Sequence, residues 1–197
     1  MRWIRATLDR RRLRKQIQAG APDWSLAHRV WGYAHQVNRG LIGPGARSTV
    51  ELEAVEALAA MAPDAEARFE SLLHDPNPCV CGYALLGLYR LQSSLLLQLP
   101  GTLFEREDVL VWQLGCFATE EPLGTFAETI RQDHEANEEL RARPSMTVQL
   151  DEKGWVKCPF CSQRFKLTDP AAYWDGRCLA CLAKLEAPQE WPLGEGD

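Results

Sequence analysis

Four cysteines near the C-terminus have the type and the spacing of a metal site. Cys158 and Cys161 form one C-x-x-C pair, Cys178 and Cys181 form a second, and 16 residues separate the two pairs. Tetrahedral zinc prefers soft ligands, and each C-x-x-C turn presents two thiolates to one ion. Four thiolates fill the coordination shell and leave no position for water or substrate. The spacing therefore predicts one structural Zn²⁺ and not a catalytic one.

The alternatives for these pairs are two disulfides or a redox C-x-x-C motif. The chain has seven cysteines, an odd number, of which four stand in metal-type pairs. That usage favours a reducing compartment and bound metal over a disulfide framework. The region resembles a zinc ribbon, which implies a small β-rich module. So short a module buries too little apolar surface to fold alone, and zinc is expected to supply much of its folding free energy.

The three other cysteines have two interpretations. Cys79 stands at a predicted helix start, where the dipole can lower a thiol pKa, and His74 precedes it by five residues. A reactive thiol at Cys79 or Cys81, or a second metal site, is one interpretation. Burial, which is common for free cysteine, is the other, and we favour it for these two and for Cys116. No phosphate loop, nucleophile elbow or acid/base pair stands out, so we expect no enzyme.

The histidines complete no ligand set. His28 and His35 are seven residues apart and can share a helix face, but no carboxylate or cysteine accompanies them. Trp24 and Trp31 have the same spacing, so this helix is expected to pack an aromatic stripe into the core. The segment Asp133-His134-Glu135 lies on a polar predicted helix and is expected to be solvated.

Positive charge is concentrated at the start of the chain. Residues 1–19 contain seven cations and one acid, a charge of +6, so the remaining residues carry −11 against a formal net charge of −5. The run Arg10-Arg11-Arg12-Leu13-Arg14-Lys15 is of a kind that contacts RNA, DNA or an anionic membrane surface. We favour the other interpretation, a solvated helix whose cations pair with acidic groups of the body. Its apolar residues split between two sides and form no clean membrane-binding face.

Nucleic-acid binding by the zinc module is the minor interpretation. Residues 151–197 carry six cations and eight acids, and four thiolates with one Zn²⁺ would add a further −2. Phosphate binding depends on concentrated positive charge, which this module lacks in excess. A local cationic patch of Lys157, Arg164 and Lys166 keeps nucleic-acid binding as an alternative. The aromatic residues beside it can stack on bases but are expected to form the core of the module instead.

Most of the chain is predicted to be helical, so helices are expected to position these groups. The sequence predicts helices over 1–19, 23–38, 48–61, 64–74, 79–92, 105–118 and 125–143, with a looser segment over 93–103. Asp23 and Asp64 are predicted caps. Ser48-Thr49-Val50-Glu51 and Thr125-Phe126-Ala127-Glu128 have the pattern of capping boxes. After Pro144 an alternating pattern predicts a β-hairpin of 147–150 with 155–157, which leads into the first cysteine pair.

A 28-residue period links three of the predicted helices. Leu58-Ala59, Leu86-Gly87 and Leu114-Gly115 repeat at this step, and a small residue beside a large one lets stacked helices approach. The middle of the chain resembles a HEAT repeat of the type common in bacterial proteins. The residues that carry the resemblance are Leu72-Leu73-His74-Asp75-Pro76-Asn77-Pro78-Cys79-Val80-Cys81, then Ala84, Leu85, Gly87 and Leu88. Cys81 stands where the family usually has an arginine that ties the turn to neighbouring repeats.

The resemblances imply a mainly α fold, a right-handed HEAT-like α-solenoid stack followed by a small zinc ribbon. The expected domains are a basic N-terminal helix (1–20), a helical HEAT-like domain (21–144) and a zinc-ribbon module (145–197). The expected function is a non-enzymatic protein-interaction or scaffold protein, because the fold itself carries no chemistry. The alternative is a nucleic-acid-binding accessory factor that uses the basic helix and the ribbon.

The expected location is the cytoplasm. No run of residues approaches the ~18 apolar residues that a membrane span needs. The basic start is not followed by an apolar stretch of signal-peptide type, so we expect an unprocessed chain. The cysteine usage, which indicates a reducing compartment, agrees with this location.

Overall fold

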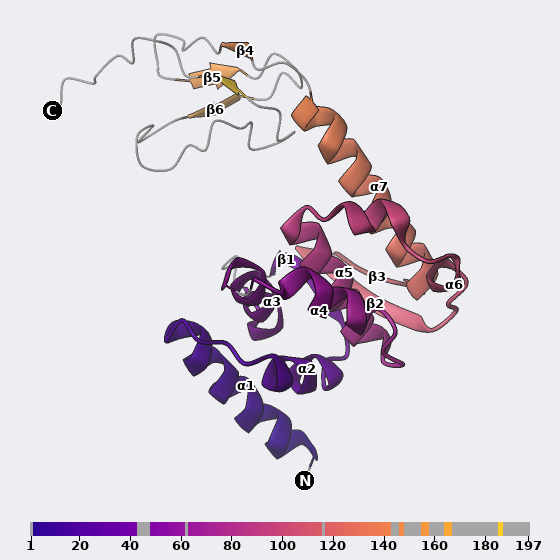
Figure 1. The fold of residues 1–197 in the computed structure, drawn as a ribbon. Helices are drawn as coiled ribbons and strands as arrows, with labels where there is room; N and C mark the ends of the chain where they lie inside the picture. Colours follow the sequence, from indigo (N-terminus) through magenta and orange to yellow (C-terminus); the bar gives the residue numbers. More distant parts are fainter. Residues whose placement is uncertain are drawn as a thin grey trace, which may run out of the picture. The chain divides into compact units, whose positions relative to one another are not determined.

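The computed structural model describes residues 2–42, 48–61, 63–115, 117–142, 146–147, 155–157, 164–166 and 185–186. The chain divides into two compact units, Met1–His134 and Glu135–Asp197. The described residues are mainly helical, with a three-stranded sheet in the first unit (Figure 1). This confirms the mainly α class. Within these residues no helix is both long enough and apolar enough to cross a membrane.

The helices of the first unit surround a small sheet. They are α1 (Arg2–Gln18), α2 (Trp24–Gly32), α3 (Val50–Met61), α4 (Ala65–Leu72), α5 (Pro78–Leu91), the 3-10 segment η1 (Ser94–Gln98) and α6 (Gly101–Phe104). The sheet has the order β1 (Val37–Ile42), β2 (Val109–Gly115), β3 (Phe117–Pro122), with β1 parallel and β3 antiparallel to β2. The helix α7 (Leu123–Ala142) follows β3 directly and starts in this unit.

Helix α5 forms the centre of the core (Figure 1). Every residue from Cys79 to Leu88 is buried, as expected for a helix that is apolar on all sides. Helices α2, α3 and α4 and strands β1 and β2 contact it. The predicted aromatic stripe is confirmed, because Trp31 stacks on Tyr83 with 5.9 Å between ring centroids and Trp24 meets Phe69 edge-on at 4.9 Å.

Several helix ends follow the local sequence. The Asp23 side chain caps α2 by accepting a hydrogen bond from the Leu26 amide at 2.7 Å, as predicted. Asn77 caps α5 in the same way, accepting from the Cys79 amide at 2.9 Å. Asp64 makes no capping bond and pairs with Arg68 instead. Helices α4 and α5 therefore both begin near the predicted residues, although only α5 has a side-chain cap.

The two predicted capping boxes are wrong in detail. Thr49, one residue after the predicted cap, accepts from the Leu52 amide at 3.3 Å. Glu51, which a box would bond to the cap, is buried and binds Arg10 instead. Helix α7 begins at Leu123 and not at Thr125. The chain turns from β3 straight into the helix, so the helix start is fixed by packing and not by a side-chain cap.

The predicted helix over 105–118 is wrong, because strands β2 and β3 occupy this region. The β-branched and aromatic residues of Val109–Trp112 suit a pleated strand, and each pairs with a residue of β3. The third copy of the 28-residue period, Leu114-Gly115, therefore lies at the end of a strand. The helix predicted over 23–38 ends at Gly32, and its last residues join β1.

The described strands of the second unit form two short pairs. Strand β5 (Trp155–Lys157) pairs antiparallel with β6 (Arg164–Lys166), and β4 (Met146–Thr147) pairs parallel with β7 (Leu185–Glu186). Of the predicted hairpin of 147–150 with 155–157, residues 148–150 lie outside the described residues, and the second strand, β5, pairs with β6. The chain between β5 and β6 contains Cys158 and Cys161.

Candidate functional site on helix α1

Helix α1 is docked on the first unit along one face. Leu13 is fully buried and Ala6 nearly so, and the helix contacts α2 and α3 (Figure 1). Asp9, which is also buried, lies 3.6 Å from the Arg29 guanidinium of α2. The basic helix is thus part of the folded unit and holds its side chains in fixed directions.

Two cations of α1 face inward and bind α3. Arg10 Nε donates to Glu51 Oε1 at 2.6 Å, and Arg14 Nε donates to Glu53 Oε2 at 3.2 Å. Glu51 is only 6% exposed, so its charge requires a partner. Both carboxylates lie in the first turn of α3, where negative charge complements the helix dipole. For Arg10 and Arg14 the predicted pairing with the acidic body is confirmed.

Four other cations of α1 face outward. Arg5, Arg11, Arg12 and Lys15 are exposed, and none of them forms an ion pair with another residue in the described part of the chain. The predicted pairing is therefore wrong for these four. The difference arises from helix geometry, because Arg11 and Lys15 share the face opposite Leu13.

Large apolar side chains are exposed on the same helix. Trp3 is 79% exposed, Ile4 60% and Leu8 49%. Ile4, Leu8, Arg11 and Lys15 follow one another at spacings of four, three and four residues, which places them along one helical face. We call Trp3, Ile4 and Leu8 the apolar patch of α1, although Trp3 lies on a different side of the helix from Ile4 and Leu8. It lies in the N-terminal half of α1 together with the exposed Arg5, and the other outward cations lie in the C-terminal half, which we call the cationic half.

A cavity of about 790 Å³ lies between the cationic half of α1 and the start of α3. Its lining residues are Thr7, Leu8, Arg10, Arg11, Arg12, Arg14, Lys15, Gln18, Ser48, Thr49, Val50 and Glu51. Five of them are cations and one is a carboxylate, so the cavity is cationic in a protein of negative net charge.

A second polar cluster ties the Asp75-Pro76-Asn77-Pro78 turn to the core. Arg106 Nη1 donates to the Asp75 carbonyl at 2.8 Å and to Cys81 Sγ at 3.0 Å, and Nη2 donates to the Pro76 carbonyl at 3.2 Å. The guanidinium beside Cys81 therefore comes from Arg106, 25 residues later in the sequence. Sequence reasoning missed Arg106, and the cysteine at an arginine position was the only signal.

Replacing Arg106 by alanine should lower the free energy of unfolding by about 1–3 kcal/mol, because the partly buried Asp75 carbonyl loses its donor. Urea denaturation of the whole chain measures this loss. The matched control is Arg90→Ala, since Arg90 pairs with Glu56 at the surface with both side chains more than 40% exposed. The control should change stability by less than about 1 kcal/mol. Equal losses in the two variants would contradict a role for Arg106 in fixing the turn.

The thiols of Cys79 and Cys81 are both buried. Burial raises the pKa of the Cys79 thiol to about 11. Burial also raises the pKa of Cys81, and the nearby Arg106 charge offsets this only in part. Both thiols are protonated at neutral pH, whereas a reactive cysteine needs a depressed pKa. The buried interpretation of Cys79 and Cys81 is confirmed by their exposure of 7% and 0%.

The Cys79 thiol should make stability fall as pH rises between about 9 and 11. Its ordinary pKa is 9.0 and its folded-state pKa about 11, so in this window the unfolded chain loses the proton first and gains stability. Below pH 9 both states are protonated and the contribution is fully present. Urea denaturation of wild type and Cys79→Ala at pH 8 and pH 10.5 tests this. The gap between them should narrow at the higher pH, and a constant gap would contradict the prediction.

The remaining predicted residues are dispersed. His28 lies on α2 and binds Asp75 at 2.8 Å, whereas His35 lies beyond the helix and is exposed. His134 is buried on α7, so its predicted solvation is wrong, whereas Asp133 pairs with Arg39 and keeps a side chain that is 46% exposed. His134 is buried because α7 packs on the core at this point. Asp133 is reached by Arg39 of β1. His74 lines a second cavity of about 280 Å³ beside Arg106.

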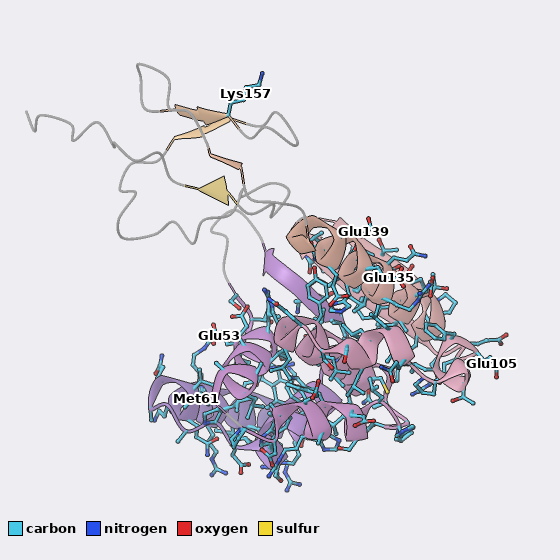
Figure 2. All side chains as sticks on the ribbon, turned by 45° about the horizontal axis from the view of Figure 1, so that its top comes forward. Glu53, Met61, Glu105, Glu135, Glu139 and Lys157 are labelled. Carbon is cyan, nitrogen blue, oxygen red and sulfur yellow. The ribbon has the colours of Figure 1, made fainter. Side chains whose placement is uncertain are left out.

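The predicted zinc ligands Cys158, Cys161, Cys178 and Cys181 lie outside the described residues, as does Cys116. In the ranges that the structure does describe, no three His, Cys, Asp or Glu side chains gather to hold a metal. Of the predicted cationic patch, Lys157 is exposed and extends away from β5 (Figure 2), and it pairs in register with Arg164. Lys166 lies two residues further along β6.

Comparison of the chain with protein-family models, with curated proteins and with solved structures finds no match. What the protein does must therefore be inferred from its own residues. The two surfaces that carry such an inference are the apolar patch and the cationic cavity of α1.

Proposed function

We propose that this protein is a non-enzymatic interaction protein that contacts a protein partner through the exposed face of α1. The observation that carries the proposal is the apolar patch, in which Trp3, Ile4 and Leu8 are each about half exposed or more. A helix that is docked along one face and still exposes three large apolar side chains near its start is typical of a surface that a partner covers. Aromatic residues such as Trp3 are enriched in such interfaces.

The charges beside the patch define the partner's chemistry. Arg5, Arg11 and Arg12 are exposed around or just beyond Leu8. A partner that buries the patch therefore carries an apolar segment flanked by acidic residues, because charge complementarity favours the encounter and suppresses wrong partners. The ion pairs of Arg10 and Arg14 with α3 keep the helix in place for this contact.

We propose further that residues 145–197 form a zinc ribbon with Cys158, Cys161, Cys178 and Cys181 as ligands. Strands β5 and β6 pair on either side of the first cysteine pair, which supports a turn that presents two thiolates. The metal would supply folding free energy to this module. Because free thiols are needed, we place the protein in the cytoplasm.

The HEAT-like part of the proposal concerns α4 and α5. These helices pack together on either side of the Asp75-Pro76-Asn77-Pro78 turn, and Arg106 supplies the guanidinium that binds the turn. The pair is consistent with one HEAT-like unit, against which α2 and α3, the helices that contact α1, pack.

Affinity capture with the full chain tests the interaction proposal. The variant Trp3→Ser with Ile4→Ser should lose its protein partner after nuclease treatment, whereas Leu97→Ser should retain it. Leu97 is a matched control because it is also a large apolar residue, 41% exposed, on η1. A loss of about tenfold in captured partner is expected from removing central apolar anchors. A partner captured equally by both variants would overturn the proposal.

A second candidate function, nucleic-acid binding, is favoured by the four outward cations of α1. It predicts an affinity that falls steeply with salt, by about one power of the salt concentration for each phosphate contacted. Removing residues 1–19 would then abolish binding to an oligonucleotide. Binding that is unchanged by salt or by this truncation would exclude the second candidate.

A further inference from the structure

We propose that the cavity between α1 and the start of α3 binds a chain of phosphate groups. Its wall contains Arg10, Arg11, Arg12, Arg14 and Lys15 and only one carboxylate, Glu51. That carboxylate is already bonded to Arg10 at 2.6 Å. The charge available to a ligand therefore comes from the other four cations, of which only Arg14 has an ion-pair partner in the described residues, Glu53.

The cations form a row along the helix. Arg11 is followed by Arg14 and Lys15 at the third and fourth residue, and Gln18 follows Arg14 at the fourth. Residues with these spacings are neighbours on a helix surface, about 5–6 Å apart at Cβ. A linear anion that lies along α1 meets two or three of them at once.

The opposite wall offers neutral donors. Ser48 and Thr49 line the cavity just before α3, and Thr49 Oγ1 accepts a hydrogen bond from the Leu52 amide. Its own hydroxyl hydrogen can therefore point to a ligand oxygen. The dipole of α3 is already complemented by Glu51 and Glu53 in its first turn, so the positive charge of the site is that of α1 and not of the helix terminus.

Phosphate groups fit this wall better than an apolar protein segment does. Guanidinium groups bind phosphate oxygens in a bidentate manner, and four of the five cations are arginines. Leu8 and Val50 are the two apolar residues of the lining, and the other lining residues apart from Glu51 carry cationic or polar end groups that can bind phosphate oxygens. Its volume of about 790 Å³ lies within the usual range of about 300–1,000 Å³ for small-ligand sites.

Titration calorimetry of the zinc-loaded full chain with inorganic triphosphate tests the proposal. We expect saturable binding that weakens about tenfold or more in Arg11→Ala with Lys15→Ala, since charge-assisted bonds are lost. The matched control, Arg5→Ala with Arg90→Ala, removes two exposed cations outside the cavity lining and should bind as wild type does. Absence of binding by wild type, or an equal loss in both double variants, would overturn the proposal.

Two further ligands separate the sources of the phosphate chain. A single-stranded oligonucleotide that binds more tightly than triphosphate, with the same loss in the cavity variant, supports a nucleic-acid backbone. Triphosphate binding with no oligonucleotide binding supports a free polyphosphate. An acidic peptide of glutamates that binds as well as either would overturn the phosphate assignment, because charge alone would then explain the affinity.

The site is separable from the protein-partner proposal. Trp3 and Ile4 do not line the cavity, so Trp3→Ser with Ile4→Ser should bind triphosphate normally even though it loses the protein partner. Normal capture of the partner together with no triphosphate binding would overturn the cavity proposal alone. Circular dichroism of each variant verifies that the helices remain folded.

Discussion

Replacing Cys158 and Cys161 together by serine should abolish zinc binding and unfold the strand pairs of the second unit. The proposed site needs all four thiolates, and two hydroxyl groups do not replace them. Structural zinc supplies about 10–16 kcal/mol of apparent folding free energy to comparable small domains. Elemental analysis should fall from one zinc per chain to none, and the amide signals of β5 and β6 should lose their dispersion in NMR spectra.

The matched control for the zinc prediction is Cys116→Ser, which removes a thiol outside the two C-x-x-C pairs. This variant should retain its zinc. The first unit should stay folded in the double variant, because its core is formed by residues of α2, α3 and α5. A double variant that keeps its zinc would show that the four cysteines are not the ligands.

Replacing Gly124 by alanine should destabilise the first unit by about 1–3 kcal/mol or more, because the new methyl group overpacks a rigid contact. A Cβ at this position would lie 2.1 Å from the Phe104 carbonyl oxygen and 2.7 Å from its carbon. These are backbone atoms, so no side-chain rotation relieves the clash. The Gly124 amide also donates to the Arg106 carbonyl at 3.0 Å, and moving α7 away would break that bond. Thermal unfolding of the whole chain measures the loss.

Gly101→Ala is the control for this prediction. A Cβ at Gly101 meets nothing within 4 Å, and alanine there reduces the entropy of the unfolded chain. Its stability should be unchanged or slightly higher. Equal melting temperatures for the two variants would mean that α7 does not pack on the Phe104 segment as described.

The close packing of α4 against α5 could be predicted from the sequence, but the sheet could not. The 28-residue period marks Gly87 as a small residue at a helix contact, and a Cβ there would lie 2.4 Å from the Phe69 ring. The period therefore located the close approach of α4 to α5. It could not distinguish a strand from a helix at Leu114, because a short apolar run such as Val109–Trp112 has no periodicity that separates the two. The pairing of β2 with β3 and with β1 depends on residues far apart in the sequence.

The candidate site was predictable only where its residues are close in sequence. The spacing of the four cysteines is sufficient to propose zinc ligands. The division of the α1 cations into an inward and an outward set is different, because it depends on Glu51 and Glu53, about 40 residues away. The sequence also could not show which side of α1 packs on the body, since apolar residues occur on two sides of this helix. Tertiary contacts of α3, and not helix periodicity, decide that Ile4 and Leu8 are exposed.

Site-specific photo-crosslinking tests most directly whether the exposed face of α1 is the contact surface. A photoreactive residue would replace Ile4 on α1 or, as control, Leu97 on η1; both positions are exposed. In a nuclease-treated lysate the account predicts a discrete protein adduct from position 4 that is absent from position 97 and is lost when Trp3→Ser is added. The same adducts from both positions, or none from position 4, would contradict it.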